Sequence, residues 1–174
     1  MDKGMKWLVD YNQVVSLYHN ESDRAAAVLA TSYLEQILEE HIRESLIDDP
    51  FVDELFIGYG PLSTFSAKIS IAYGFGLIPK WMKQDMTFIR KIRNHFAHHP
   101  FEVSFTSSPA RDLCANLSMA KPIPDSEGAT NKEREPRLQF LITVGMNIGW
   151  ISEIRLQKKE ATEQAKPLKE KQDE

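Results

Sequence analysis

The sequence predicts an all-α protein, a single-domain helical bundle of about six to seven helices within 174 residues. Three observations lead to this prediction. Apolar residues recur at spacings of three and four along most of the chain, as on the buried side of a helix. Prolines and glycines separate these periodic stretches. Only residues 101–105 alternate apolar and polar residues as a strand does, and one strand cannot form a sheet.

The N-terminal part of the chain predicts two helices. The first is expected over residues 6–18, and the clearest periodic pattern of the chain covers residues 23–47. Ser22 or Asn20 is the candidate N-cap of the second helix, and Pro50 prevents its continuation. Its apolar positions are Leu34, Ile37, Leu38 and Ile42.

A short element and a longer helix are expected next. Residues 51–56 can form a single helical turn, and the composition of residues 58–61 indicates a tight turn. Ser63 is the candidate cap of the following helix, which Pro79 ends. Four positions should share the inner face of that helix: Phe65, Ile69, Ala72 and Gly76.

The fifth helix is expected over residues 80–98, because Pro100 disfavours helical geometry in the residue before it. Residues 101–105 are expected to be extended. Ser108 and the proline after it then start a short helix over residues 109–119. The inner side of the fifth helix should contain Trp81, Asp85, Phe88, Ile89, Ile92 and Phe96, of which only Asp85 is polar.

The C-terminal part predicts a loop, a last helix and a tail. Residues 122–136 contain three prolines and show no apolar period, so we expect a loop. The last helix should begin near Arg137. Residues 156–174 are polar and rich in both charges, which is typical of a flexible tail or a fraying helix end. The expected domain therefore covers residues 1–155.

The composition argues against several classes of protein. Cys114 is the single cysteine, so neither an intrachain disulfide nor a cysteine-rich zinc site is expected, and a reduced cytoplasmic compartment is the simplest interpretation. Residues 1–11 lack the apolar segment of a signal peptide, and no run of 18 apolar residues occurs, so no membrane partner is expected. The net charge of −4 argues against nonspecific nucleic-acid binding over the whole surface.

Charge is distributed unevenly along the chain. Residues 35–54 contain eight acidic and one basic residue, whereas residues 80–99 contain five basic residues, one acidic residue and three histidines. Each segment reads first as a solvated helix face. The functional alternative is that the basic segment meets an anionic ligand, phosphate or nucleic acid.

Residues 92–99 contain the side chains best suited to chemistry. Asn94 and His98 are four residues apart and share a helix face, and the long side chain of Arg93 can reach toward them. Arginine offers a planar donor fork for phosphate, and histidine transfers protons near neutral pH. Together, such residues can cleave RNA without a metal, because the arginine stabilises the charge that develops on the phosphate.

A structural interpretation of the same segment stays open. His98 and His99 end a helix, where imidazoles can donate to free carbonyl groups. Arg93 and Asn94 can equally be buried hydrogen-bonding residues. His95 and His99 have the spacing of metal ligands, but no glutamate accompanies them and a proline follows. We therefore expect no metal and no other cofactor.

Two stretches resemble a known family. Residues 60–69 (GPLSTFSAKI) and 72–78 (AYGFGLI) look like the central signature of the mannitol operon repressor family, and residues 89–98 resemble the segment that follows it in many members. The resemblance is densest over residues 55–98 and extends over residues 23–150. It implies an all-helical, oligomeric bacterial transcriptional regulator. The sequence contains no helix-turn-helix with a basic recognition helix, so no recognisable motif supports DNA binding.

A second resemblance concerns Arg93, Asn94 and His98, which are similar to the Arg-Asn-x-x-x-His motif of HEPN domains. These domains are helical bundles that often dimerise. Several are metal-independent endoribonucleases, and others are binding or scaffold modules. The resemblance implies that Arg93 and His98 would be catalytic, in a site where helices of two subunits meet, with RNA as the partner.

Three functional hypotheses follow. The first is a cytoplasmic, homodimeric, non-enzymatic transcriptional regulator of the mannitol repressor type that acts through a protein partner. The alternative is a HEPN-type endoribonuclease, a toxin or defence component, that uses Arg93, Asn94 and His98. The third is an adaptor or scaffold bundle without a nucleic-acid role.

Overall fold

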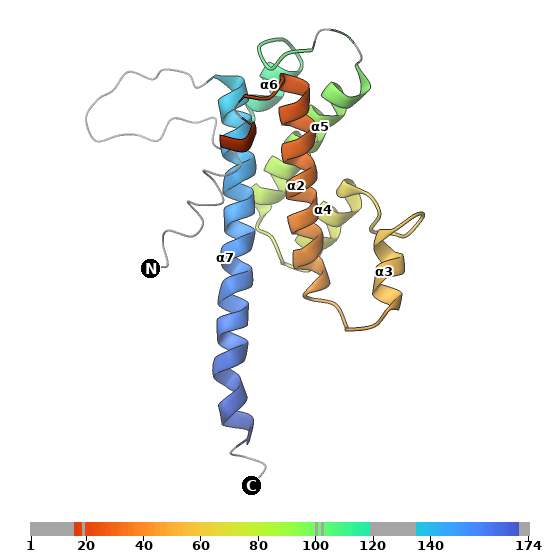
Figure 1. Cartoon of the computed structure of the whole chain (residues 1–174), viewed down its shortest axis with the longest axis vertical. Helices are drawn as coiled ribbons and strands as arrows, with labels where there is room; N and C mark the ends of the chain where they lie inside the picture. The colour runs from red at the N-terminus through yellow and green to blue at the C-terminus, as the bar shows by residue number, and fades with distance from the viewer. Residues whose placement is uncertain (1–15, 19, 100, 102, 119–134, 171–174) are drawn as a thin grey trace, which may run out of the picture.

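The computed structural model describes residues 16–18, 20–99, 101, 103–118 and 135–170. Every regular element within these residues is a helix, which confirms the predicted all-α bundle. None of these helices is long and apolar enough to cross a membrane. The labelled helices, in chain order (Figure 1), are α2 (Asp23–Arg43), α3 (Phe51–Phe56), α4 (Phe65–Gly74), α5 (Lys80–His98), α6 (Ala110–Cys114) and α7 (Pro136–Glu170).

The centre of the bundle is formed by α2, α5 and α7. Helix α2 packs against both α5 and α7, α4 covers α2 and α5, and α6 joins α5 to α7. Figure 1 shows α2 and α7 side by side, with α3 set apart on the far side of α2. Three aromatic rings connect the packed elements at one end: Phe96 lies 4.7 Å from Phe105, and Phe105 lies 5.2 Å from Phe140. Most of the other fully buried side chains are aliphatic or methionine.

Helix α2 begins where the sequence predicts and ends earlier. Ser22 is its N-cap, with a side-chain oxygen that accepts a hydrogen bond from the backbone of Ala25. The buried alanines near its start allow close packing of its neighbours. The helix ends at Arg43 rather than near residue 47. Backbone bonds from Ser45 and Leu46 reach back only three residues, which tightens and closes the last turn.

Helix α4 differs from its prediction at both ends. Thr64, not Ser63, is the N-cap, because its hydroxyl accepts the hydrogen bond from the backbone of Ala67. The helix stops at Gly74, well before Pro79. Gly76 adopts a positive φ of 69° and closes the helix with a pair of backbone bonds across its last turn. Gly76 is therefore exposed, while the other three predicted inner positions are buried.

Helix α5 has the predicted bounds, whereas α6 is shorter than predicted. The described part of residues 101–105 forms no strand; Phe105 instead enters the core. Helix α7 begins at Pro136 and continues past residue 155 without a break. The domain boundary expected between residues 155 and 156 stays a prediction. The predicted helix over residues 6–18 and the predicted loop lie mostly outside the described residues.

Candidate functional site on the outer face of α5

Helix α5 separates its side chains sharply by polarity. Its inner side is buried, and the one acidic residue of the helix, Asp85, is buried with it. The remaining sides therefore carry positive charge and no negative charge. No ion pair between described residues includes the four cations of this surface, which we call the α5 outer face: Lys80, Lys83, Arg90 and Lys91.

Aromatic rings accompany two of these cations. The ammonium group of Lys83 lies 4.4 Å from the ring centre of Tyr73, and that of Lys91 lies 5.5 Å from the ring centre of Phe88. Such contacts hold a long cationic side chain against an apolar surface without neutralising it. Phe75, just after the end of α4, is 71% exposed. The surface thus combines positive charge with exposed aromatic area, which suits an anionic partner.

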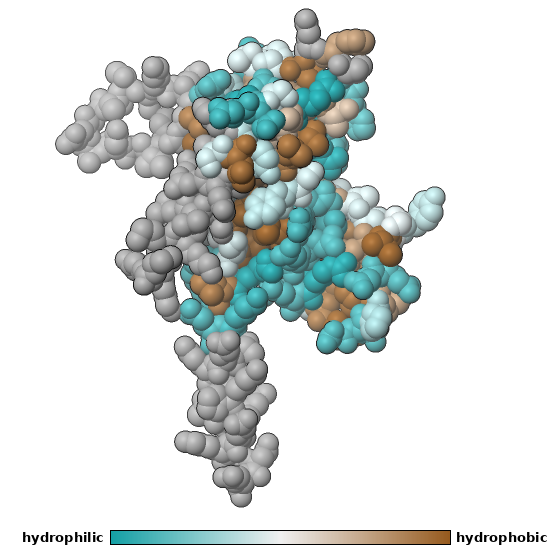
Figure 2. Space-filling view, in the orientation of Figure 1, coloured by the Kyte–Doolittle hydropathy of each residue, from teal (hydrophilic) through white to brown (hydrophobic). Residues whose placement is uncertain are grey.

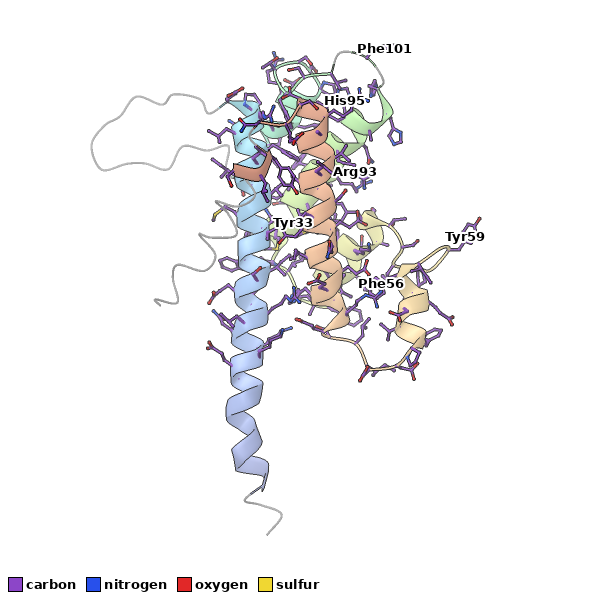
Figure 3. All side chains as sticks on the ribbon, viewed as in Figure 1. Tyr33, Phe56, Tyr59, Arg93, His95 and Phe101 are labelled. Carbon is purple, nitrogen blue, oxygen red and sulfur yellow. The ribbon has the colours of Figure 1, made fainter. Side chains whose placement is uncertain are left out.

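Arg93 points away from this face. Its guanidinium lies 3.7 Å from a carboxylate oxygen of Glu35 on α2, and Figure 3 shows it beside that helix. Glu35 also binds Lys68 at 2.8 Å, and Lys68 binds Glu39 at the same distance. Arg93 therefore stands at the end of a chain of ion pairs that connects α5, α2 and α4. This position agrees with the structural interpretation of Arg93 that the sequence left open.

Asn94 and His98 lie on the outer face, and His98 is exposed. Arg93 precedes His98 by five residues, which places the two side chains about 140° apart around an α-helix. Within one chain, the structure therefore brings Asn94 and His98 together and leaves Arg93 on the flank toward α2. A phosphate bound by all three side chains would need a movement of Arg93 away from Glu35 or a contribution from another molecule.

The two remaining histidines close the end of α5. The Nδ1 of His99 lies 2.8 Å from the carbonyl oxygen of His95, and the two rings are 4.4 Å apart. Burial, together with the neighbouring His99, lowers the pKa of His95 below its usual value. Arg24 donates a hydrogen bond to the carbonyl of His99, so this end of the helix is fastened to α2. Within the described residues, no three potential ligands gather to hold a metal ion.

The buried Asp85 forms a second polar centre that the sequence signalled only as a discordant residue. Its carboxylate accepts hydrogen bonds from the backbone and the hydroxyl of Ser118 and lies 3.5 Å from the amide nitrogen of Asn147. Burial raises the pKa of Asp85 although these bonds favour the charged form. The centre ties α5 to α7 and to the segment after α6; Asp85 and Asn147 are buried, whereas Ser118 is exposed. Its role is therefore to position α5.

The fold and this site define a small helical-bundle protein with an exposed cationic helix and an ion-paired flank. The sequence profile of the MtlR (mannitol repressor) family matches residues 23–164. The chain therefore belongs to the mannitol repressor family, as the resemblance implied.

Two solved structures share the fold. The X-ray structure of the MtlR–HPr complex from Escherichia coli contains a chain that is 20% identical, with a TM-score of 0.65 over 83% of this chain and 99% of that chain. A possible transcriptional regulator, YggD from Shigella flexneri 2a str. 2457T, is 14% identical, with a TM-score of 0.56 over 83% of this chain and 95% of that chain. No curated protein sequence matches the chain significantly.

Proposed function

We propose that this protein is a cytoplasmic, non-enzymatic transcriptional regulator that acts through a protein partner. The observation that carries the proposal is the family match over residues 23–164. The geometry of α5 agrees with it, because Arg93 is held by Glu35 and does not converge with His98 in one chain. The cytoplasmic location is the simplest interpretation of a chain with a single cysteine, Cys114.

Deletion of the gene tests the regulatory role. Transcripts of the neighbouring sugar- or polyol-transport operon are expected to rise, and a wild-type copy should restore them. A copy with Arg93→Ala and His98→Ala should restore them equally, since no catalytic step is involved. Unchanged transcripts after deletion would contradict the proposal, and failure of the double variant, despite normal protein levels, would argue for a chemical role of the motif.

The partner is tested separately. The similar E. coli chain was crystallised with HPr, so we propose an HPr-type protein as the partner here. Titration calorimetry with purified full-length chain and HPr from the same bacterium should show saturable binding of one HPr per chain. Absence of heat and of co-elution at micromolar concentrations of both proteins would exclude this partner and leave the regulatory role to another.

A second candidate function is a HEPN-type endoribonuclease. One observation favours it: Asn94 and His98 share the outer face, and His98 is exposed where a phosphate can reach it. RNA would be incubated with the purified protein in EDTA, beside His98→Ala as the matched variant. Cleavage that disappears in the variant would support this function. No cleavage, or equal cleavage by both proteins, would exclude it.

A further inference from the structure

A second exposed surface is acidic, in contrast to the basic α5 outer face. It is formed by residues 44–59, which contain α3 and its two connections and which we call the α3 arm. Figure 1 shows the arm beside the bundle, and Figure 2 shows apolar and charged side chains mixed over it. The arm lines a hollow of about 550 Å³ between the end of α2 and α3. Its apolar side chains in solvent are Ile47, Phe51, Ile57 and Tyr59.

Contacts with the bundle and tight backbone packing hold the arm in place. Phe56 is buried against the bundle with the guanidinium of Arg43 4.0 Å above its ring, and Arg43 also binds Asp53 at 2.7 Å. A side chain at Gly60 would collide with the backbone oxygen of Glu54, 2.2 Å from the position of a Cβ atom. Figure 3 shows the result: Phe56 points toward α2 while Tyr59 points outward. Tyr59 is thus held in solvent, away from the core of the bundle.

The charge of the arm is as uniform as that of α5, with the opposite sign. Residues 44–54 contain five carboxylates and no cation. Asp48 and Glu54 are exposed and take part in no ion pair between described residues. Nucleic acid and anionic lipid are repelled by such a surface. A cationic protein surface with aromatic side chains is the complement that it fits.

This chain carries that complement itself. The α5 outer face presents four cations, of which Lys80 and Lys91 are exposed and Lys83 lies against the ring of Tyr73. In the view of Figure 1, the arm and the C-terminal end of α5 both lie on the side of α2 away from α7. Under twofold symmetry, an arm that meets the α5 outer face of a second chain receives the arm of that chain on its own α5. The contact then occurs twice in the assembly, which doubles the area that a single docking contact buries.

We propose that the protein forms a symmetric homodimer in which the α3 arm of each chain docks on the α5 outer face of its partner. Tyr59 and Phe51 supply the apolar contact, and Asp48 and Glu54 meet the cations of the α5 outer face. This assembly goes beyond the proposed regulatory function and does not depend on the identity of the regulated operon.

Light scattering on the full chain after size exclusion tests the assembly first. At micromolar concentration, the mass should be twice that of the monomer, and it should decrease at high salt because exposed charges are screened. Tyr59→Ser should weaken dimerisation about tenfold or more, as expected for a central aromatic contact. A monomeric mass at all concentrations would overturn the proposal, and so would a dimer that Tyr59→Ser leaves unchanged.

A charge exchange then tests the pairing of the two surfaces. Asp48→Lys with Glu54→Lys makes the arm positive, and Lys80→Glu with Lys91→Glu makes α5 negative. Each double variant alone should be monomeric, since like charges meet in both contacts. Their equimolar mixture should restore the dimer, because one contact regains its attraction with exchanged signs and the other is wild type.

The control for the α5 variant makes the same change of charge outside both surfaces, Arg111→Glu with Lys158→Glu, and should remain dimeric. Circular dichroism establishes that every variant keeps its helical content. A mixture of the two folded variants that stays monomeric would overturn the proposed pairing, as would double variants that dimerise on their own.

Discussion

At the scale of single residues, the most informative side chain is Lys68. It is 5% exposed and lies between two carboxylates of α2, 2.8 Å from Glu35 and 2.8 Å from Glu39. Burial lowers the pKa of Lys68, but the hydrogen bonds to both carboxylates outweigh burial and raise it. The charge is therefore retained inside the bundle, where it fastens α4 to α2 and supports the glutamate that holds Arg93.

Lys68→Met should reduce the free energy of unfolding by about 2 to 4 kcal/mol, because two neighbouring carboxylates lose their shared counter-ion. The carboxylates are partly exposed, which keeps the loss below that of a fully buried pair. Urea denaturation at neutral pH measures it. Lys159→Met, at an exposed position of α7, is the control and should change stability by less than about 0.5 kcal/mol. Equal effects of the two substitutions would contradict this role of Lys68.

His41 provides a prediction about pH. Its ring is fully buried, with Nε2 3.2 Å from the carbonyl oxygen of Leu77 and with Nδ1 lacking a hydrogen-bond partner in the described structure. Burial lowers the pKa of His41 below the usual 6.5. The unfolded chain therefore takes up this proton at a higher pH than the folded chain. The stabilising effect of the neutral ring is present above pH 6.5 and is lost as the pH falls toward the folded pKa.

His41→Gln removes this titration and keeps a donor for Leu77. Unfolding free energies of the wild type and the variant should be compared by urea denaturation over the interval below pH 6.5. The wild type should lose more stability than the variant as the solution is acidified. The carboxylates titrate in both proteins, so their contribution cancels in the difference. Parallel curves for the two proteins would show that His41 is not responsible.

At the scale of elements, the ends of α2 and α4 show how local hydrogen bonds override a periodic pattern. Apolar periodicity continues past Arg43 toward Ile47, yet the helix closes once backbone groups find partners three residues back. In α4 the positive φ of Gly76 allows the closing bonds, and Pro79 plays no part in ending the helix. Because α2 ends at Arg43, the following residues belong to the α3 arm. Because α4 ends at Gly74, Phe75 lies outside the helix and is exposed.

Thr64→Ala should cost about 1 kcal/mol of unfolding free energy, because the first turn of α4 loses the acceptor for the backbone N–H of Ala67. Ser63→Ala is the matched control. Its hydroxyl is not the cap, so its removal should cost less than about 0.5 kcal/mol. Thermal or urea denaturation of both variants decides the question. A larger loss of unfolding free energy for Ser63→Ala would show that Ser63 is the cap, as the sequence predicts.

At the scale of the whole molecule, α7 is the longest element and the bundle uses only its first part. Its buried side chains end at Ile151, and Arg155 then binds Glu40 of α2 and Glu44, the residue after α2, at 2.8 Å each. From Gln157 to Lys159 the side chains are exposed. The contribution of α7 to the core therefore ends close to the boundary predicted between residues 155 and 156.

Removal of residues 158–174 should shift the unfolding midpoint by no more than about 2 °C, because the deleted described part buries little apolar area. Removal from residue 155 onward also deletes the pairs to Glu40 and Glu44 and should lower the midpoint clearly further. Thermal unfolding followed by circular dichroism compares the two truncated chains. A large loss for the shorter deletion would place the end of the domain beyond residue 157.

The sequence by itself determined the helical class, the bounds of α5 and the residues of its candidate motif. These depend on neighbours within a few positions, such as the period that buries Ile89, Ile92 and Phe96 and the proline after His99. The family, too, was readable from a contiguous stretch of residues.

Only the tertiary structure decided where the side chains of the motif lie. Arg93 and Glu35 are 58 positions apart, and no local pattern specifies that α2 packs on α5 with these two side chains in contact. The same holds for Lys68, whose charge is tolerated only because two distant carboxylates surround it. Local periodicity states which side of a helix is buried, whereas the charge that a side chain meets depends on how whole helices pack against one another.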